Sequence, residues 1–222
     1  MVRAKVTSIR LAQESGEEEK AKTLAEHHSY IQLALGYTRP RKPMLLITHG
    51  LSGSGKSVIS AQLADAGGFI HIRSDVERKR LFGIDSLDRS AGKGLDIYTA
   101  ETTRKTYAAM LDATSTALSA GFPVIVDATF PDAHKRAPFL RLARTLEYPC
   151  HILCFHAPRE VLRERVRARH EAASDASEAD LNVLEAQLHA IAPPDGDEKA
   201  LCIKIDTEGE INIEALLKAL EQ

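Results

Sequence analysis

The sequence has no tryptophan, only three cysteines and no long run of apolar residues. A membrane-spanning helix needs about 20 consecutive apolar residues. No segment approaches that length, and the N-terminus lacks the hydrophobic region of a signal peptide. We therefore predict no membrane association. An odd, small number of cysteines in 222 residues argues against a disulfide framework and predicts reduced thiols in a cytoplasm.

Excess charge of either sign is also missing. Lys and Arg total 29 and Asp and Glu total 31, so the net charge is −2 at pH 7. This balance argues against nucleic acid as a partner, because binding to a phosphate backbone depends on an excess of positive charge. Hydrophobic residues make up 44% of the chain, which is enough for one α/β domain with a sizeable core and an appendage.

The strongest pattern in the chain is residues 50–57, GLSGSGKS, which fit the phosphate-loop motif G-x-x-x-x-G-K-[ST]. The apolar residues 44–48 precede it and predict a buried strand, and Val58, Ile59 and Leu63 follow at helical spacing. A phosphate loop lies in this context, between a strand and a helix. The alternative interpretation is a flexible Gly/Ser turn.

A loop of this kind holds anions with its backbone N–H groups, and the following helix adds its positive N-terminal end. Lys56 can reach the β- and γ-phosphates, and the Ser57 hydroxyl can bind Mg²⁺. We therefore predict ATP and Mg²⁺ as cofactors. The predicted nucleotide-binding residues are Gly50, Ser52, Gly53, Ser54, Gly55, Lys56, Ser57 and Val58.

Strands and helices alternate through the rest of the chain, which predicts an α/β fold with a mostly parallel sheet and helices on both faces. Further strands are expected at residues 69–72, 124–126, 150–155 and 201–205. This domain spans residues 44–222. Residues 1–43 precede it and read as a helical appendage of two helices.

The two appendage helices each carry an apolar face. Val2, Val6 and Ile9 mark the first, and Leu24 and Leu35 belong to the second. Two short helices have no core of their own, so we expect these faces to pack on something.

Ligands of such sheets bind beyond the carboxyl ends of the strands, where Asp75 and Asp127 are found. Asp127 could hold Mg²⁺ opposite Ser57, or it could cap the next helix. Asp75 could act as the general base that activates a hydroxyl. The alternative is a routine helix start, because Ser74-x-x-Glu77 fits a capping box.

Basic side chains supply the other candidates. Arg165 and Arg169 lie four residues apart on a helix opening at Pro158, so they could serve as arginine fingers on a lid over about residues 158–180, or belong to a solvated face. Arg78, one turn from Asp75, could bind an anionic substrate or lie on a solvated face.

Three residues look like metal ligands on paper: Cys150, Cys154 and His156. On a strand, four residues span roughly 13 Å, too far for one ion, so we interpret these three as core residues.

Four stretches carry a family resemblance: residues 48–57, 72–81, 124–130 and 175–179. The chain resembles the P-loop kinase half of bacterial bifunctional aminoglycoside-phosphotransferase-like/ATP-binding proteins, and more distantly the zeta-toxin, chloramphenicol-phosphotransferase and polynucleotide 5′-kinase group. The resemblance implies a five-stranded sheet in the order 2-3-1-4-5.

The resemblance also implies roles for individual residues. It implies that Asp75 activates a hydroxyl, that Asp75 and Arg78 form an Asp-x-x-Arg pattern, and that Arg165 and Arg169 are lid arginines. Residues 2–6 are similar to the final helix of the phosphotransferase-like half. This similarity implies an aminoglycoside-phosphotransferase-like domain or protein as a partner.

These observations predict a kinase that transfers the γ-phosphoryl group of ATP to a hydroxyl of a small-molecule acceptor. Two alternatives stay open: an ATP-binding regulatory switch, and a polynucleotide 5′-kinase, which the sequence pI of about 6.5 disfavours. The chain has neither the N-K-x-D motif of GTPases nor the L-S-G-G-Q stretch of ABC-type ATPases.

Overall fold

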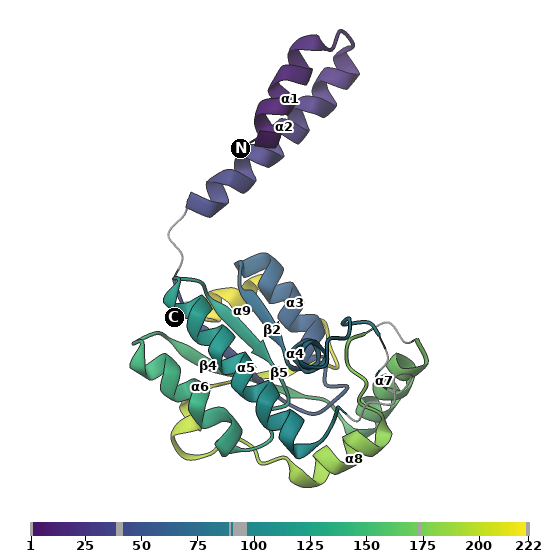
Figure 1. The fold of residues 1–222 in the computed structure, drawn as a ribbon, viewed down its shortest axis with the longest axis vertical. Helices are drawn as coiled ribbons and strands as arrows, with labels where there is room; N and C mark the ends of the chain where they lie inside the picture. The colour runs from purple at the N-terminus through teal and green to yellow at the C-terminus, as the bar shows by residue number, and fades with distance from the viewer. Residues whose placement is uncertain (1, 39–41, 89, 91–96, 173–174, 221–222) are drawn as a thin grey trace. The chain divides into compact units, whose positions relative to one another are not determined.

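The computed structural model describes residues 2–38, 42–88, 90, 97–172 and 175–220. The chain forms two compact units, residues 1–41 and residues 42–222 (Figure 1). Within the described residues, no helix is both long enough and apolar enough to cross a membrane.

The first unit is a pair of helices, α1 (Val2–Gln13) and α2 (Glu17–Thr38). Small and polar side chains make the contact between them: Ala4, Thr7 and Thr23 are buried, and His27 Nδ1 lies 3.1 Å from the Thr7 hydroxyl. The predicted apolar face of α1 is not packed against α2.

Val2, Val6 and Ile9 of that face are 80%, 57% and 52% exposed. The small and polar residues at the contact let α1 and α2 approach closely, whereas a row of larger aliphatic side chains there would hold the two helices apart.

The second unit contains a five-stranded sheet in the order β2-β3-β1-β4-β5, and every neighbouring pair of strands is parallel. The predicted fold and strand order are therefore confirmed. The strands are β1 (Leu45–His49), β2 (Ile70–Arg73), β3 (Val124–Asp127), β4 (Cys150–His156) and β5 (Cys202–Asp206).

Successive strand residues point to opposite faces of the sheet, so each face has its own core. Leu45, Ile47 and Val126 face one core, which α5 (Ala100–Ser119) and α6 (Ala133–Thr145) cover. Leu46 and Ile125 face the other, where α3 (Lys56–Gly67) and α9 (Ile213–Leu220) pack together. The central strands are buried on both sides, which explains their continuous apolar runs.

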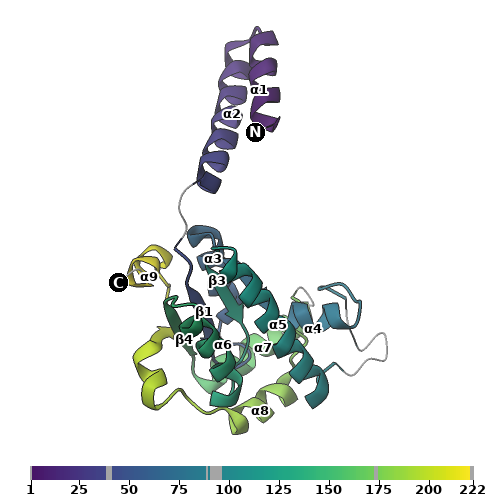
Figure 2. The same cartoon turned by 60° about the vertical axis from the view of Figure 1, so that its left-hand side comes forward.

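A separate cluster joins α7 (Arg159–Ala172) to α8 (Leu181–Ala190). Leu162, Val166 and Leu184 are buried in it, and Leu51, just after β1, packs against them. The two helices therefore pack at the carboxyl end of β1 (Figure 2). The short helix α4 (Ser74–Leu81) follows β2, and a 3₁₀ helix (Gly196–Leu201) precedes β5.

The metal-like trio proves to be only partly core. Cys150 and Cys154 are half-buried and pack against the α5 and α6 side of the sheet. His156, at the end of β4, is exposed, so placing it in the core was wrong. Among the described residues, no group of three or more His, Cys, Asp or Glu side chains is arranged to hold a metal ion.

Candidate active site

The loop between β1 and α3 requires glycine at particular positions. Gly53 and Gly55 both have φ of +82°, a region that other residues rarely adopt. A Cβ atom on Gly53 would lie 2.6 Å from the Leu162 carbonyl oxygen, and one on Gly55 would lie 3.2 Å from Thr207 Cγ2. The glycines therefore let the loop pass close to its neighbours.

No side chain caps the N-terminus of α3, whose N-cap residue is Gly55. The first N–H groups of a helix have no partner within it, so this end is suited to bind an anion. The Lys56 ammonium folds back over the loop and donates to the Leu51 carbonyl oxygen at 2.6 Å. Burial lowers the pKa of Lys56 to about 8, although the charges of Asp127 and Asp75 oppose this shift.

Asp127 ends β3 and is 4% exposed. Burial alone would raise its pKa, but a hydrogen bond from His71, the charge of Lys56 and a hydrogen bond from Ser57 lower the pKa below its ordinary value. The carboxylate is therefore charged. Asp127 does not cap the next helix, because Asp132 caps α6 by accepting the Lys135 N–H at 2.9 Å.

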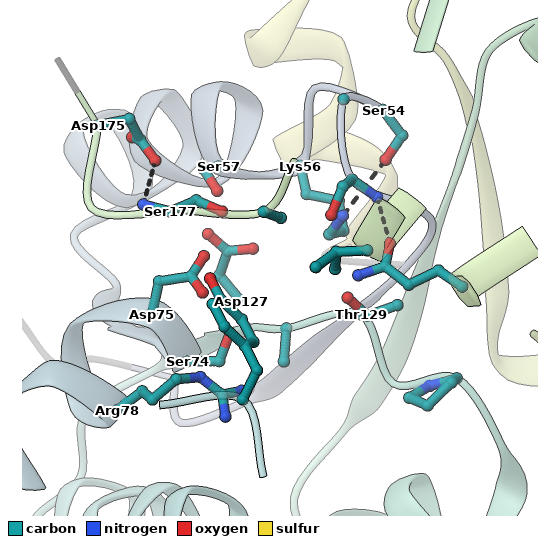
Figure 3. A pocket seen from close by; sticks show the side chains of 18 of the residues that line it. Ser54, Lys56, Ser57, Ser74, Asp75, Arg78, Asp127, Thr129, Asp175 and Ser177 are labelled. Atoms are coloured by element: carbon teal, nitrogen blue, oxygen red, sulfur yellow. Dashed lines mark hydrogen bonds between the residues drawn. The ribbon is translucent and has the colours of Figure 1, made fainter. Parts of the chain in front are cut away.

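Asp75 lies in the first turn of α4 and lines the same cavity as the loop. The predicted capping box is wrong: α4 begins at Ser74 itself, its N-cap is Arg73, and no side chain caps it. Glu77 pairs with Arg80 at 2.7 Å instead. The Asp75 and Asp127 carboxylates point into one space, with Ser57 across from them (Figure 3).

That space is a cavity of about 700 Å³, within the usual range for small-ligand sites. Of the predicted site residues, only Gly50 does not line it. The loop residues 52–58 all do, together with Asp75, Arg78, Asp127, Arg165 and Arg169.

Arg78 and Lys79 leave α4 in different directions. Arg78 lines the cavity but is 7% exposed, so it is not on a solvated face. Lys79 is 1% exposed and forms an ion pair with Glu178 at 3.0 Å, which ties α4 to the segment before α8. Of the three consecutive basic residues 78–80, only Arg78 therefore lines the cavity.

Arg165 and Arg169 both line the cavity from α7. The Arg165 guanidinium donates to the Thr207 carbonyl oxygen at 2.7 Å and to the Thr207 hydroxyl at 2.9 Å. Arg169 donates to the Ala179 carbonyl oxygen at 2.9 Å. Both arginines are thus held by neutral oxygens at the cavity edge.

Two contacts at the site have no signal in the sequence. Gln187 of α8 accepts the Ser52 N–H of the loop through Oε1 at 2.8 Å. Arg73, at the end of β2, pairs with Asp175 at 3.0 Å and lies 3.6 Å from Asp127. Each joins segments far apart in the chain, so only a covariation between distant positions would have indicated them.

The profile of the AAA domain family matches residues 45–194, which include the loop at residues 50–57, Asp75, Asp127, Arg165 and Arg169. The chain belongs to this AAA domain family. A comparison with curated protein sequences gives no significant match.

Solved structures similar to this AAA domain include several kinases. A putative kinase from Chloroflexus aurantiacus is 19% identical with a TM-score of 0.63, over 82% of this chain and 96% of that one. An APS kinase from Mycobacterium tuberculosis, in complex with AMPPNP and APS, is 16% identical with a TM-score of 0.58, over 82% and 100%.

A gluconokinase from Sinorhizobium meliloti is 20% identical with a TM-score of 0.53, over 81% of this chain and 90% of that one. At these identities the similarity shows the fold.

Proposed function

We propose that this AAA domain protein is an ATP-dependent kinase that phosphorylates a hydroxyl group of a small molecule. The observation that carries the proposal is that the phosphate loop and the Asp75 carboxylate open into one cavity. A loop alone would indicate nucleotide binding, whereas a carboxylate facing it across open space can activate an acceptor. The kinases among the similar structures agree with this assignment.

The phosphate side of the site would be formed by residues 52–58. Their N–H groups and the α3 N-terminus would hold the β- and γ-phosphates, and Lys56 would add its charge. Gln187 accepts a hydrogen bond from the Ser52 N–H, so its side chain lies where the phosphates would approach the loop. Arg165 and Arg169, at the cavity edge, would neutralise charge that develops during transfer.

The donor set fits Mg²⁺. The Ser57 hydroxyl and the charged Asp127 carboxylate both line the cavity, and Ser57 is one of the groups that lower the pKa of Asp127. Mg²⁺ prefers oxygen ligands and keeps waters or substrate phosphates in its remaining positions, so two protein oxygens suffice. When bound, the ion would neutralise phosphate charge.

In the transfer step, the acceptor oxygen attacks the γ-phosphorus while its proton passes to an Asp75 carboxylate oxygen. A bond forms between the acceptor oxygen and the γ-phosphorus, the bond from the γ-phosphorus to the β–γ bridging oxygen breaks, and ADP leaves. Arg78, one turn along α4 and lining the same cavity, would hold the acceptor. The aminoglycoside-phosphotransferase-like partner gains no support from the relatives named above and stays a prediction.

Incubation with ATP labelled in its γ-phosphate and a fractionated metabolite extract tests the proposal. We expect the label to enter a small molecule through an alkali-stable phosphate ester. ATP turnover to inorganic phosphate alone, with no labelled product in any fraction, would favour the ATP-binding switch. Label on oligonucleotide 5′ ends would favour the polynucleotide kinase.

A further inference from the structure

Two cations lie on tyrosine rings along the cavity wall beside Asp75. The Arg78 guanidinium carbon is 5.0 Å from the centre of the Tyr98 ring, and Lys135 Nζ is 5.0 Å from the centre of the Tyr107 ring. All four residues line the same cavity as Asp75. A cation over an aromatic face is held in place while its charge stays available to a ligand.

The Arg78 charge is buried without a counter-charge. Its Nη1 donates to the Ile97 carbonyl oxygen and to the Thr103 hydroxyl, each at 3.2 Å, and its Nε is buried with no hydrogen-bond partner. Among the described residues, no carboxylate lies within ion-pair distance of it. Neutral oxygens and a ring face do not offset a buried charge fully.

Lys135 also lacks a counter-charge, although its side chain is only half-buried. The nearest acid in sequence, Asp132, uses its carboxylate to accept the Lys135 backbone N–H. Across the part of the chain that the structure describes, the Lys135 ammonium has no ion pair. Nearby cations differ: Arg73 pairs with Asp175 and Lys79 with Glu178.

The nucleotide phosphates do not account for these two charges. Lys56, Arg165 and Arg169 are the cations that line the cavity from the phosphate loop and α7, on the side where the triphosphate would lie. Arg78 and Lys135 belong to the α4, α5 and α6 wall, which also holds Asp75. Positive charge on the acceptor side therefore exceeds the single negative charge of Asp75.

We infer that the acceptor is a small hydroxylated acid, whose carboxylate, phosphate or sulfate group is bound by Lys135 and Arg78 while its hydroxyl faces Asp75. This inference rests on the proposed kinase function. Lys135 thereby acts as a specificity-determining residue. The cavity of about 700 Å³ must admit the acceptor together with the triphosphate end of ATP, so the acceptor is small.

Binding to the full chain saturated with AMPPNP and Mg²⁺ tests the inference, because the phosphate loop is then filled. The probes are sulfate, glycerate and gluconate, with glycerol and glucitol as neutral partners that carry a hydroxymethyl group in place of the carboxylate. Calorimetry should show at least one acid binding about tenfold or more tightly than its neutral partner.

Lys135→Met should weaken the binding of that acid by about tenfold or more, and Lys135→Arg should recover most of the lost affinity. The affinity for AMPPNP should stay within about twofold in both variants. Lys105→Met is the matched control, since Lys105 lies on α5 in an exposed pair with Glu101, and it should change neither affinity.

The inference of an acidic acceptor would be overturned if the acids bound no better than the neutral compounds, or if Lys135→Met left the affinity for the acid unchanged. Neither result would affect the proposed kinase function. Failure of AMPPNP to bind would instead overturn the proposed function.

Discussion

At the scale of single residues, the cost of removing Lys56 from water shapes the site. Its ammonium donates to a backbone carbonyl within its own loop, and burial brings its pKa from an ordinary 10.5 to about 8. A triphosphate beside the ammonium would favour the charged form and raise that pKa again. Nucleotide binding is therefore expected to be accompanied by proton uptake at pH values where Lys56 is partly neutral.

ATP affinity should fall as the pH rises through about 8. Between pH 7 and pH 9, a lysine with a pKa near 8 loses most of its charge, so the dissociation constant should rise by about tenfold. Calorimetry at pH 8.5, in buffers with different ionisation enthalpies, should show net proton uptake. Lys56→Arg stays charged, so a similar fall in that variant would show that another group is responsible.

The stability of the nucleotide-free protein should change in the opposite direction. Between pH 8 and 10.5 the unfolded chain binds more protons at this lysine than the folded chain does, so the Lys56 contribution to the free energy of unfolding rises with pH in that window. Urea unfolding of the wild-type protein and of Lys56→Met isolates this contribution. If the free energy of unfolding changed equally with pH in the two proteins, the lowered pKa of Lys56 would be contradicted.

At the scale of elements, α4 is anchored by a residue that faces away from the site. Lys79 is 1% exposed, pairs with Glu178, and donates to the Ser86 and Asp88 carbonyl oxygens at 2.9 and 2.7 Å. Its neighbour Arg80 pairs with Glu77 with 63% of its side chain exposed. Two adjacent cations on one helix thus form ion pairs in opposite environments.

Lys79→Met should lower the free energy of unfolding by about 3 kcal/mol, because it leaves the Glu178 charge without its buried counter-charge. Arg80→Met is the control from the same helix and should change stability little, since an exposed pair contributes little. Urea denaturation of both variants makes the comparison. Similar effects of the two substitutions would contradict the buried pairing.

Helix α8 is joined to the phosphate loop through Gln187, which accepts the Ser52 N–H. Gln187→Ala should lower the free energy of unfolding by about 1 kcal/mol, the usual contribution of such a bond. Gln187→Glu keeps the acceptor oxygen and should preserve stability, yet its charge should weaken ATP binding by about tenfold or more. Unchanged ATP affinity in Gln187→Glu would place this side chain away from the phosphates.

Local pattern predicted the elements that position the site. The strand at residues 44–48, the loop and the following helix could be assigned because each depends on neighbours in sequence. The contacts of Gln187, Lys79 and Lys135 could not, since they join positions far apart. Ser52 and Gln187, for example, are 135 residues apart, and no periodicity records which α8 residue meets the loop.

At the scale of the whole molecule, the two units differ in how they are stabilised. Residues 42–222 contain all three apolar clusters, whereas residues 1–41 pair through Ala4, Thr7 and Thr23 and leave Val2, Val6 and Ile9 exposed. The candidate site draws every lining residue from the larger unit.

A protein shortened to residues 42–222 should therefore bind ATP within about twofold of the full chain. The physical reason is that the removed helices contribute no residue to the apolar clusters or the cavity lining. Calorimetry with both proteins, after circular dichroism confirms folding, makes the comparison. A loss of ATP affinity in a folded truncation would show that the first unit takes part in the site.

The central claim is that Asp75 activates an acceptor across the cavity from the phosphate loop. Asp75→Asn keeps the size of the side chain but removes the proton acceptor, so ATP affinity should stay within about twofold while transfer of label to the metabolite fraction falls by about a hundredfold or more. Asp65→Asn, an exposed position on α3, is the matched control and should behave as wild type. Transfer at the wild-type rate in Asp75→Asn would contradict the account.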